Sequence, residues 1–155
     1  MQFLRELSAN HVLIATAISW AVAQGTKVII NLFKVKKLDL KVIFANGGMP
    51  SGHTATVIAL TVMSAYVDGF SSASFAIALI LSMVVIRDAT GVRLEVSKHA
   101  KTIKQLCETV KSQCPEEKIS TDDYKMRVGH TSSEVAMGAL AGAVVSVLYI
   151  LLILN

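Results

Sequence analysis

A histidine at the end of a glycine-rich run is the first residue in the chain that could act on a phosphate ester. His53 closes the run Gly-Gly-Met-Pro-Ser-Gly-His at 47–53, directly before an apolar block. Pro50 and Ser51 favour a helix start here, which would leave the amides of Gly52 and the following residues free to bind an anion such as phosphate. His53 could then donate a proton to a leaving oxygen. The alternative is a glycine-rich turn capped by Ser51, with no function.

A second histidine, His130, precedes another apolar block and has Glu134 four residues later. Residues four apart share one face of a helix. A carboxylate beside an imidazole fixes its tautomer and stabilises its positive form. That arrangement suits a histidine that acts as a nucleophile and accepts a phosphoryl group. Thr131 and Glu134 also satisfy the capping box, which would make Glu134 purely structural.

Cationic and amide side chains near two other apolar blocks could complete an anion site. Arg87, Asp88 and Arg93 end the third block. Arginine suits bidentate phosphate binding, and Asp88 could orient an arginine or a histidine; the alternative is an ordinary basic flank. Gln24 and Lys27 lie inside the first block. Lys27 could reach the same pocket or extend to the lipid headgroups.

The composition predicts that membrane helices position these residues. Hydrophobic residues make up 53% of the chain and charged residues 17%, whereas soluble domains carry about a quarter charged residues. A helix needs about 20 residues to cross the hydrocarbon core. We therefore expect an all-α integral membrane helical bundle in one domain, 1–155. Its four transmembrane helices should span about 11–33, 54–70, 73–93 and 131–154, with a polar connection at about 94–129.

The charges of the connections predict on which side of the membrane the candidate residues lie. Only Ser71 and Ser72 separate the second and third blocks, so these blocks should form a hairpin, and the two longer, basic connections emerge on the opposite side. By the positive-inside rule that side is the cytoplasm, with both termini outside. His53, His130, Arg93 and Lys27 then all fall at the cytoplasmic face.

An amphipathic helix is expected within the long connection. Apolar residues recur there at helical spacing, at Val92, Val96, Ile103, Leu106 and Val110. Lysines occupy much of the remaining helix surface. This cytoplasmic helix could lie on an anionic membrane face. Packing on its own domain is an equal alternative.

Two kinds of partner can be judged from the sequence. The net charge is +4, but lysine and arginine fall between apolar blocks without interleaved aromatics, which argues against nucleic acid. Gly138 and Gly142 form a small-residue face that suits close helix packing. This face could join a homodimer or pack within one bundle; membrane lipids are the other expected neighbours.

At these residues the sequence resembles the type 2 phosphatidic acid phosphatase superfamily, which includes the vanadium haloperoxidases. It is more similar to the small divergent bacterial and plant branch. That branch carries Gly-Gly-Met-Pro-Ser before a histidine, then Asp-Ala-x-Gly-Val-Arg, then Gly-His with a glutamate four positions on. The matching segments here are 47–53, 88–93 and 129–134, and Gln24 and Lys27 fit the first helix of the branch.

The resemblance implies a helical membrane fold that hydrolyses phosphate esters without a metal or other cofactor. By analogy His130 would be the nucleophile, Glu134 its orienting acid and His53 the general acid, with Asp88 as a further catalytic candidate. The implied phosphate-binding residues are Ser51, Gly52, Lys27, Arg93 and Gln24. The substrate would be a lipid or isoprenoid phosphate, in a bacterial inner membrane or a plastid membrane.

Two features of the wider superfamily are absent. Its first motif is a lysine followed seven positions later by Arg-Pro; Lys34 and Lys41 have that spacing without the Arg-Pro pair. Tyr124 stands where an arginine precedes the third motif, and Arg93 or Arg127 could replace it. The alternative function is therefore a noncatalytic membrane protein that binds or transports anionic lipid or phosphate. A structural membrane subunit is the third possibility.

Overall fold

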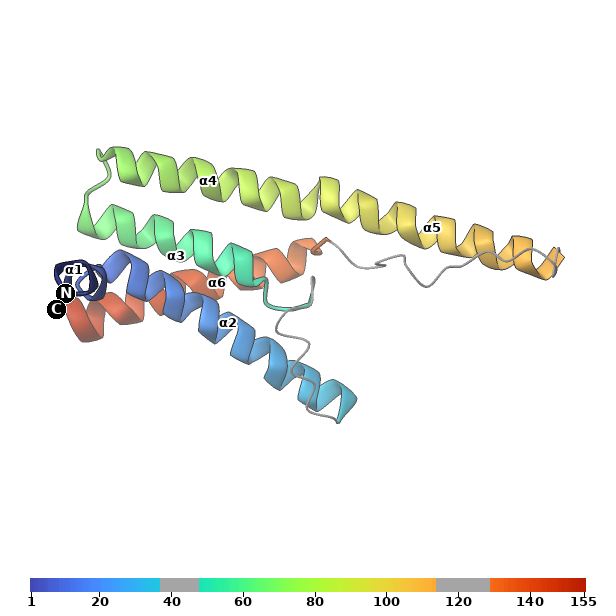
Figure 1. The fold of residues 1–155 in the computed structure, drawn as a ribbon, viewed down its shortest axis with the longest axis horizontal. Helices are drawn as coiled ribbons and strands as arrows, with labels where there is room; N and C mark the ends of the chain where they lie inside the picture. Colours follow the sequence, from blue (N-terminus) through green and yellow to red (C-terminus); the bar gives the residue numbers. More distant parts are fainter. Residues whose placement is uncertain (37–47, 114–128) are drawn as a thin grey trace.

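The computed structural model describes residues 1–36, 48–113 and 129–155. Within these ranges every regular element is helical (Figure 1). The elements in chain order are α1 Gln2–Ser8, α2 His11–Val35, α3 Gly52–Val67, α4 Ala73–Thr90, α5 Val92–Gln113 and α6 Ser132–Tyr149, followed by a π-helical turn, Ile150–Leu154. The predicted all-α class is confirmed.

Each of the four long apolar helices begins at a residue whose side chain caps it. The Asn10 side chain accepts a hydrogen bond from the third amide of α2, and Ser51, Ser72 and Thr131 do the same for α3, α4 and α6. Side-chain oxygens at this position satisfy amides that have no partner inside the helix. The polar residue before each apolar block thus sets where the helix starts.

Small residues allow the helices to pack closely. α3 contacts α2, α4 and α6, and α2 also contacts α6. The Ser19 hydroxyl of α2 donates to the Ala55 carbonyl of α3 at 3.1 Å. A Cβ on Gly142 of α6 would lie 2.5 Å from the same carbonyl oxygen, and one on Gly138 would lie 2.5 Å from the Ser51 carbonyl oxygen. The glycine face therefore packs within the bundle, which is one of the two arrangements expected for it.

The lengths and compositions of the helices suit a membrane protein. Three helical stretches are long and apolar enough to cross a bilayer, namely His11–Phe33, Ala73–Val110 and Ser132–Leu154. α3 is apolar but shorter, with 16 residues, or about 24 Å at 1.5 Å per residue. The hydrocarbon core is about 30 Å thick, so α3 depends on its neighbours to cover its ends. The predicted bundle of about four apolar helices is confirmed.

Three of the four apolar helices differ from their predicted bounds by two or three residues. α2 ends at Val35 instead of about 33. α3 spans Gly52–Val67 instead of about 54–70, because it begins directly after the Ser51 cap and ends before Gly69, whose φ is +88°. α4 ends at Thr90 instead of about 93. The helical direction nevertheless continues across Gly91, where the Glu95 amide donates to the Gly91 carbonyl at 3.0 Å, and α5 projects beyond the ends of the other helices (Figure 1).

The apolar side of α5 is open in the described part of the chain. Its predicted apolar residues are all exposed, at Val92, Val96, Ile103, Leu106 and Val110. Among the described elements α5 contacts α4 alone, so these residues give no support to the alternative of packing within the domain. Docking of this helix on an anionic membrane face stays a prediction.

The candidate motifs and the chain termini lie at opposite ends of the bundle. Both termini and the turn between α3 and α4 are at one end in Figure 1, whereas α3 and α6 begin at the other. This arrangement has the connectivity expected from the sequence. Which end faces the cytoplasm stays a prediction.

Candidate functional site

The two residues predicted as nucleophile and orienting acid are paired and buried. His130 Nδ1 lies 3.1 Å from Glu134 Oε2, and both residues are 6% exposed. When a carboxylate accepts a hydrogen bond from the Nδ1–H group, the lone pair of the neutral ring is on Nε2. Nε2 of His130 is therefore the nitrogen that could attack phosphorus.

Glu134 serves both roles that its position allows. Its Oε2 also accepts from the Thr131 amide at 3.2 Å, while the Thr131 hydroxyl accepts from the Glu134 amide at 3.4 Å. The capping box is therefore formed. Because the same carboxylate oxygen interacts with His130, the helix cap also determines the position of the imidazole.

Backbone hydrogen bonds join the three sequence motifs. The Ser51 amide donates to the Glu134 carbonyl at 3.0 Å, and the His130 amide donates to the Ala89 carbonyl at 3.2 Å. The Gly129 amide donates to the Ser97 hydroxyl at 3.0 Å. These contacts hold the starts of α3 and α6 against the junction of α4 and α5. Chain segments that are 32 to 83 residues apart in sequence thus meet at one end of the bundle.

Lys27 belongs to this cluster. Its residue is 5% exposed, and its Cδ would lie 3.5 Å from a Cβ built on Gly48. The charge of Glu134 acts on the Lys27 ammonium group. The Lys27 side chain thus points into the protein beside the motif residues and does not extend to the lipid headgroups.

Gln24 lies one turn before Lys27 and contacts the start of α3. Its Nε2 would be 3.1 Å from a Cβ on Gly52, so an alanine there would have to displace the Gln24 side chain. Gln24 Oε1 is buried and has no hydrogen-bond partner among the described residues. Gln24 and Gly52 therefore lie side by side, as expected if both face one ligand.

His53, the candidate general acid, is exposed at the start of α3. The charges of His130, Arg93, Lys27 and Asp88 all act on it. The charge of His130 thus reaches His53, although the two histidines are far apart in the sequence. The first-turn amides of Gly52 and His53 lie where a helix has no internal partners for them.

The Ser51 side chain caps α3, which is the structural role that the sequence analysis considered for it. Ser51 is fully buried, and its hydroxyl oxygen accepts from the Thr54 amide at 3.4 Å and from the Thr54 hydroxyl at 3.0 Å. It caps α3, so any contact of this segment with phosphate falls to the backbone and to residues nearer the surface.

Asp88 and Arg93 pair with each other across the junction of α4 and α5. Arg93 Nε donates to Asp88 Oδ2, and the two side chains are 48% and 43% exposed. Asp88 thus orients an arginine, as one of the predicted roles requires. An Arg93 side chain held here still presents its other guanidinium nitrogens to a bound anion.

Some positioning groups could not be found from the sequence. The carbonyl of Ala89 and the hydroxyl of Ser97 hold the His130 segment, but neither residue type is distinctive. Gly129 packs on the start of α5, where a Cβ would lie 2.4 Å from the Leu94 amide nitrogen. The sequence signal was the glycine itself. The positions predicted at Lys41, Tyr124 and Arg127 lie outside the described residues.

Comparison with known proteins matches the chain to a protein family and to a bacterial membrane protein. The divergent PAP2 family matches residues 8–145. The chain is also 33% identical over 145 residues to the uncharacterized membrane protein YuiD of Bacillus subtilis (strain 168), in a match covering 88% of this chain and 92% of that protein. No solved structure matches the chain significantly.

Proposed function

Because the chain belongs to the divergent PAP2 family, we propose that this membrane protein is a phosphatase for a lipid or isoprenoid phosphate. The observation that carries the proposal is the buried contact between His130 Nδ1 and Glu134 Oε2 at 3.1 Å, at the start of a helix and beside His53. A structural pair alone would not require a second histidine and a buried lysine at the same place.

In the proposed first step, His130 Nε2 attacks the phosphorus atom of the substrate. A bond forms between nitrogen and phosphorus while the bond from phosphorus to the lipid oxygen breaks. His53 gives its proton to that leaving oxygen, so the lipid departs as an alcohol, or as a phosphate if the substrate is a diphosphate. Glu134 stabilises the positive charge that His130 gains.

In the second step, water releases phosphate from His130. His53, now neutral, takes a proton from the attacking water, and the phosphorus–nitrogen bond breaks to return the free imidazole. The Lys27 ammonium group, the Arg93 guanidinium group and the amides at the start of α3 would stabilise the negative oxygens in both transition states. Each such interaction contributes about 2.7–4 kcal/mol in enzymes where it has been removed.

The proposed site opens toward the cytoplasm. Arg87 and Arg93 flank the junction of α4 and α5 that holds the His130 segment, and Lys98 and Lys101 follow on α5, whereas α1 near the termini has Arg5 beside Glu6. The positive-inside rule supports this orientation. A substrate would then enter from the cytoplasmic leaflet, with its chain among the lipids and its phosphate at the helix starts.

The test is phosphate release by the purified protein in lipid nanodiscs, with lipid monophosphates and isoprenoid diphosphates as substrates. His130→Ala should reduce release to background, and His53→Ala should slow it strongly. His99→Ala is the matched control, because His99 is exposed on α5; it should leave the rate unchanged. If no substrate yields phosphate, or if His130→Ala releases it at the wild-type rate, the proposal fails.

The second candidate is a noncatalytic protein that binds or transports anionic lipid or phosphate. Tyr124, at the position where the wider superfamily has an arginine, favours it, because a protein that only binds phosphate needs fewer groups to stabilise a transition state. Orthovanadate separates the two candidates. A phosphatase should be inhibited by vanadate bound at His130, whereas a protein that only binds should take up phosphate without turnover in the wild type.

A further inference from the structure

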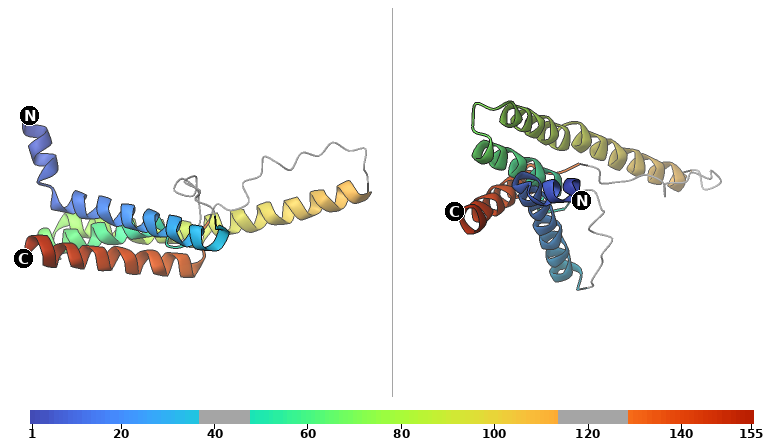
Figure 2. Two further views of the ribbon diagram at one scale, coloured as in Figure 1. Left: turned by 90° about the horizontal axis from the view of Figure 1, so that it is seen from below. Right: turned by 60° about the vertical axis from the view of Figure 1, so that its left-hand side comes forward.

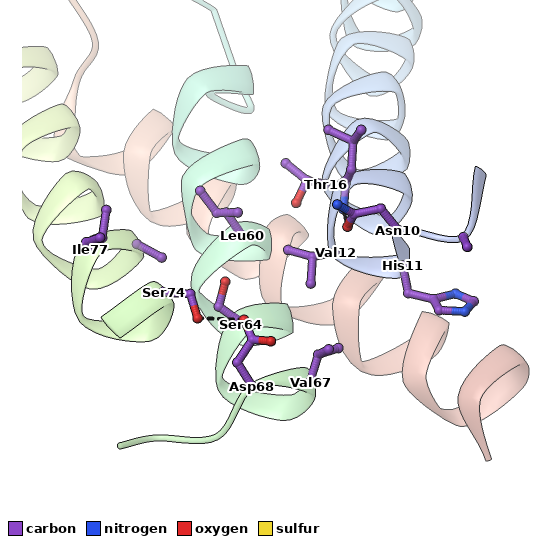
Figure 3. Close-up of a pocket in the computed structure, with 13 residues that line it drawn as sticks. Asn10, His11, Val12, Thr16, Leu60, Ser64, Val67, Asp68, Ser74 and Ile77 are labelled. Carbon is purple, nitrogen blue, oxygen red and sulfur yellow. Dashed lines mark hydrogen bonds between the residues drawn. The ribbon is translucent and has the colours of Figure 1, made fainter. Parts of the chain in front are cut away.

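A pocket of about 820 Å³ lies between α2, α3 and α4 at the end of the bundle that holds both termini (Figure 3). It is therefore remote from the candidate phosphatase site. Most of its surface is apolar, with walls formed by Val12, Leu60, Val67 and Ile77. In a membrane, an open pocket between neighbouring helices is accessible to lipid from the adjacent leaflet.

One buried hydroxyl in this pocket lacks a partner. Thr16 is 9% exposed, and its Oγ1 has no hydrogen bond to any described residue. Other threonines in the apolar helices donate to the carbonyl four residues earlier, Thr26 to Val22 and Thr61 to Val57, each at 2.8 Å. Thr16 does not make this bond and lies between α2 and α3 in Figure 3. This buried hydroxyl is unsatisfied, and a ligand that supplied an acceptor would satisfy it.

Thr16 lies near this end of the bundle, five residues after His11, where α2 begins, or about 7.5 Å along the helix. α1 turns sharply away from α2 at this level (Figure 2) and exposes Phe3, Leu4 and Leu7, as a helix lying in the interface would.

The mouth of the pocket carries negative charge. Among the described residues that line it, Asp68 is the one with a formal charge, and the His11 ring is engaged by the Tyr149 hydroxyl at 3.0 Å. Asp68 is exposed, and its Oδ2 accepts from the Ser74 hydroxyl at 2.6 Å (Figure 3). A carboxylate here attracts an ammonium headgroup and repels an anionic one.

We propose that this pocket binds a phospholipid with a protonated amine headgroup, from the leaflet that contains the chain termini. One acyl chain lies along the apolar wall of α3, an ester carbonyl accepts a hydrogen bond from Thr16 Oγ1, and the amine lies beside Asp68. Phosphatidylethanolamine has this chemistry. The pocket is separate from the phosphatase site, and its occupant is bound but not cleaved.

The first experiment compares ester-linked and ether-linked phosphatidylethanolamine of equal chain length, in competition for the full-length protein, by native mass spectrometry. The ether lipid has no carbonyl to accept from Thr16. The wild type should prefer the ester lipid by about 2- to 10-fold, the range expected for one hydrogen bond. Thr16→Val should abolish the preference, and Thr16→Ser should retain it.

Thr26→Val is the matched control, since Thr26 is on the same helix and bonds its own backbone. It should keep the wild-type preference. The proposal is overturned if the wild type binds both lipids equally, as a nonspecific lipid shell would, or if Thr16→Val and Thr26→Val behave alike. Phosphate release is not measured here, so failure of this proposal is distinct from failure of the phosphatase.

The second experiment compares phosphatidylethanolamine with phosphatidylglycerol of the same chains. Because Asp68 is exposed, its effect should be small, and the wild type should prefer the amine lipid by up to about 5-fold. Asp68→Asn should remove this preference, while Asp68→Glu should keep it. A preference for phosphatidylglycerol in the wild type, or an unchanged ratio in Asp68→Asn, would contradict the assigned headgroup.

Discussion

Gly138→Ala probes the contact that brings His130 to the start of α3. A Cβ at this position would lie 2.5 Å from the Ser51 carbonyl oxygen and 3.1 Å from the Cβ atoms of Ser51 and Thr54. Real Cβ atoms stay at least 3.0–3.4 Å from such neighbours, so α6 would have to move away by about 0.5–0.9 Å. The Ser51 carbonyl is part of the backbone, which cannot rotate aside as a flexible side chain can.

Two opposing free energies decide the outcome. Overpacking of this kind destabilises proteins by about 1–3 kcal/mol. Replacing glycine by alanine within a helix stabilises it by about 0.5–1 kcal/mol. We expect the overpacking to dominate at Gly138. At Gly25 of α2, where nothing lies within 4 Å of an added Cβ, only the stabilising effect should remain.

The assay is thermal unfolding of both variants in the same detergent. The difference between Gly138→Ala and Gly25→Ala isolates the overpacking, about 1–3 kcal/mol, or about 2–12 °C in the midpoint for a chain of this size. The shift of α6 should also lengthen the bond from the Ser51 amide to the Glu134 carbonyl, now 3.0 Å. Phosphate release should therefore fall in Gly138→Ala and not in the control.

Equal or higher stability of Gly138→Ala relative to Gly25→Ala would refute the close approach of α6 to α3. A shift in the oligomeric state would instead indicate the homodimer, the other arrangement considered for this glycine face. If two copies met through Gly138 and Gly142, the substitution would shift the monomer–dimer equilibrium, measured by light scattering, while leaving the unfolding of the monomer nearly unchanged.

Two further substitutions test the surroundings of the site. Thr131→Ala removes the hydroxyl that caps α6 at the Glu134 amide and should destabilise the protein by about 0.5–2 kcal/mol; an unfolding midpoint equal to that of the wild type would show that the capping box contributes nothing. Asp88→Asn removes an ion pair with Arg93 whose side chains are nearly half exposed, so the free energy of unfolding should change by no more than about 1 kcal/mol. A loss clearly above that in denaturant titrations would mean that the pair is shielded from water in the assembled protein.

Much of the fold was predictable because it depends on local chemistry. Blocks of apolar residues longer than a few helical turns have few alternatives to membrane helices, since lipid cannot satisfy backbone amides and carbonyls. The starts of these helices follow from single residues, such as Ser51 and Thr131, whose side chains cap the first turn. The sequence predicts the end of α4 three residues too late, because the apolar pattern continues through Gly91 into α5.

The residues of the candidate site were predictable from the sequence, whereas most of the contacts between them were not. Spacing alone places Glu134 one turn after His130, and the structure pairs them because helical residues four apart share a face. The same spacing allowed Glu134 to be only a cap, and it could not exclude that Lys27 extends to the headgroups. The position of α2 against the glycine-rich run decides the second question, since it buries Lys27 beside Gly48.

The sequence by itself determined a helical membrane protein, the starts of its helices and the residues able to act on phosphate, because each depends on composition or on neighbours within a turn or two. Only the tertiary structure decided that α6 meets α3 through glycine, that the Ser51 and His130 amides bond to distant carbonyls, and that the Thr16 hydroxyl has no partner. These features depend on distances between segments far apart in the chain, which no local pattern specifies.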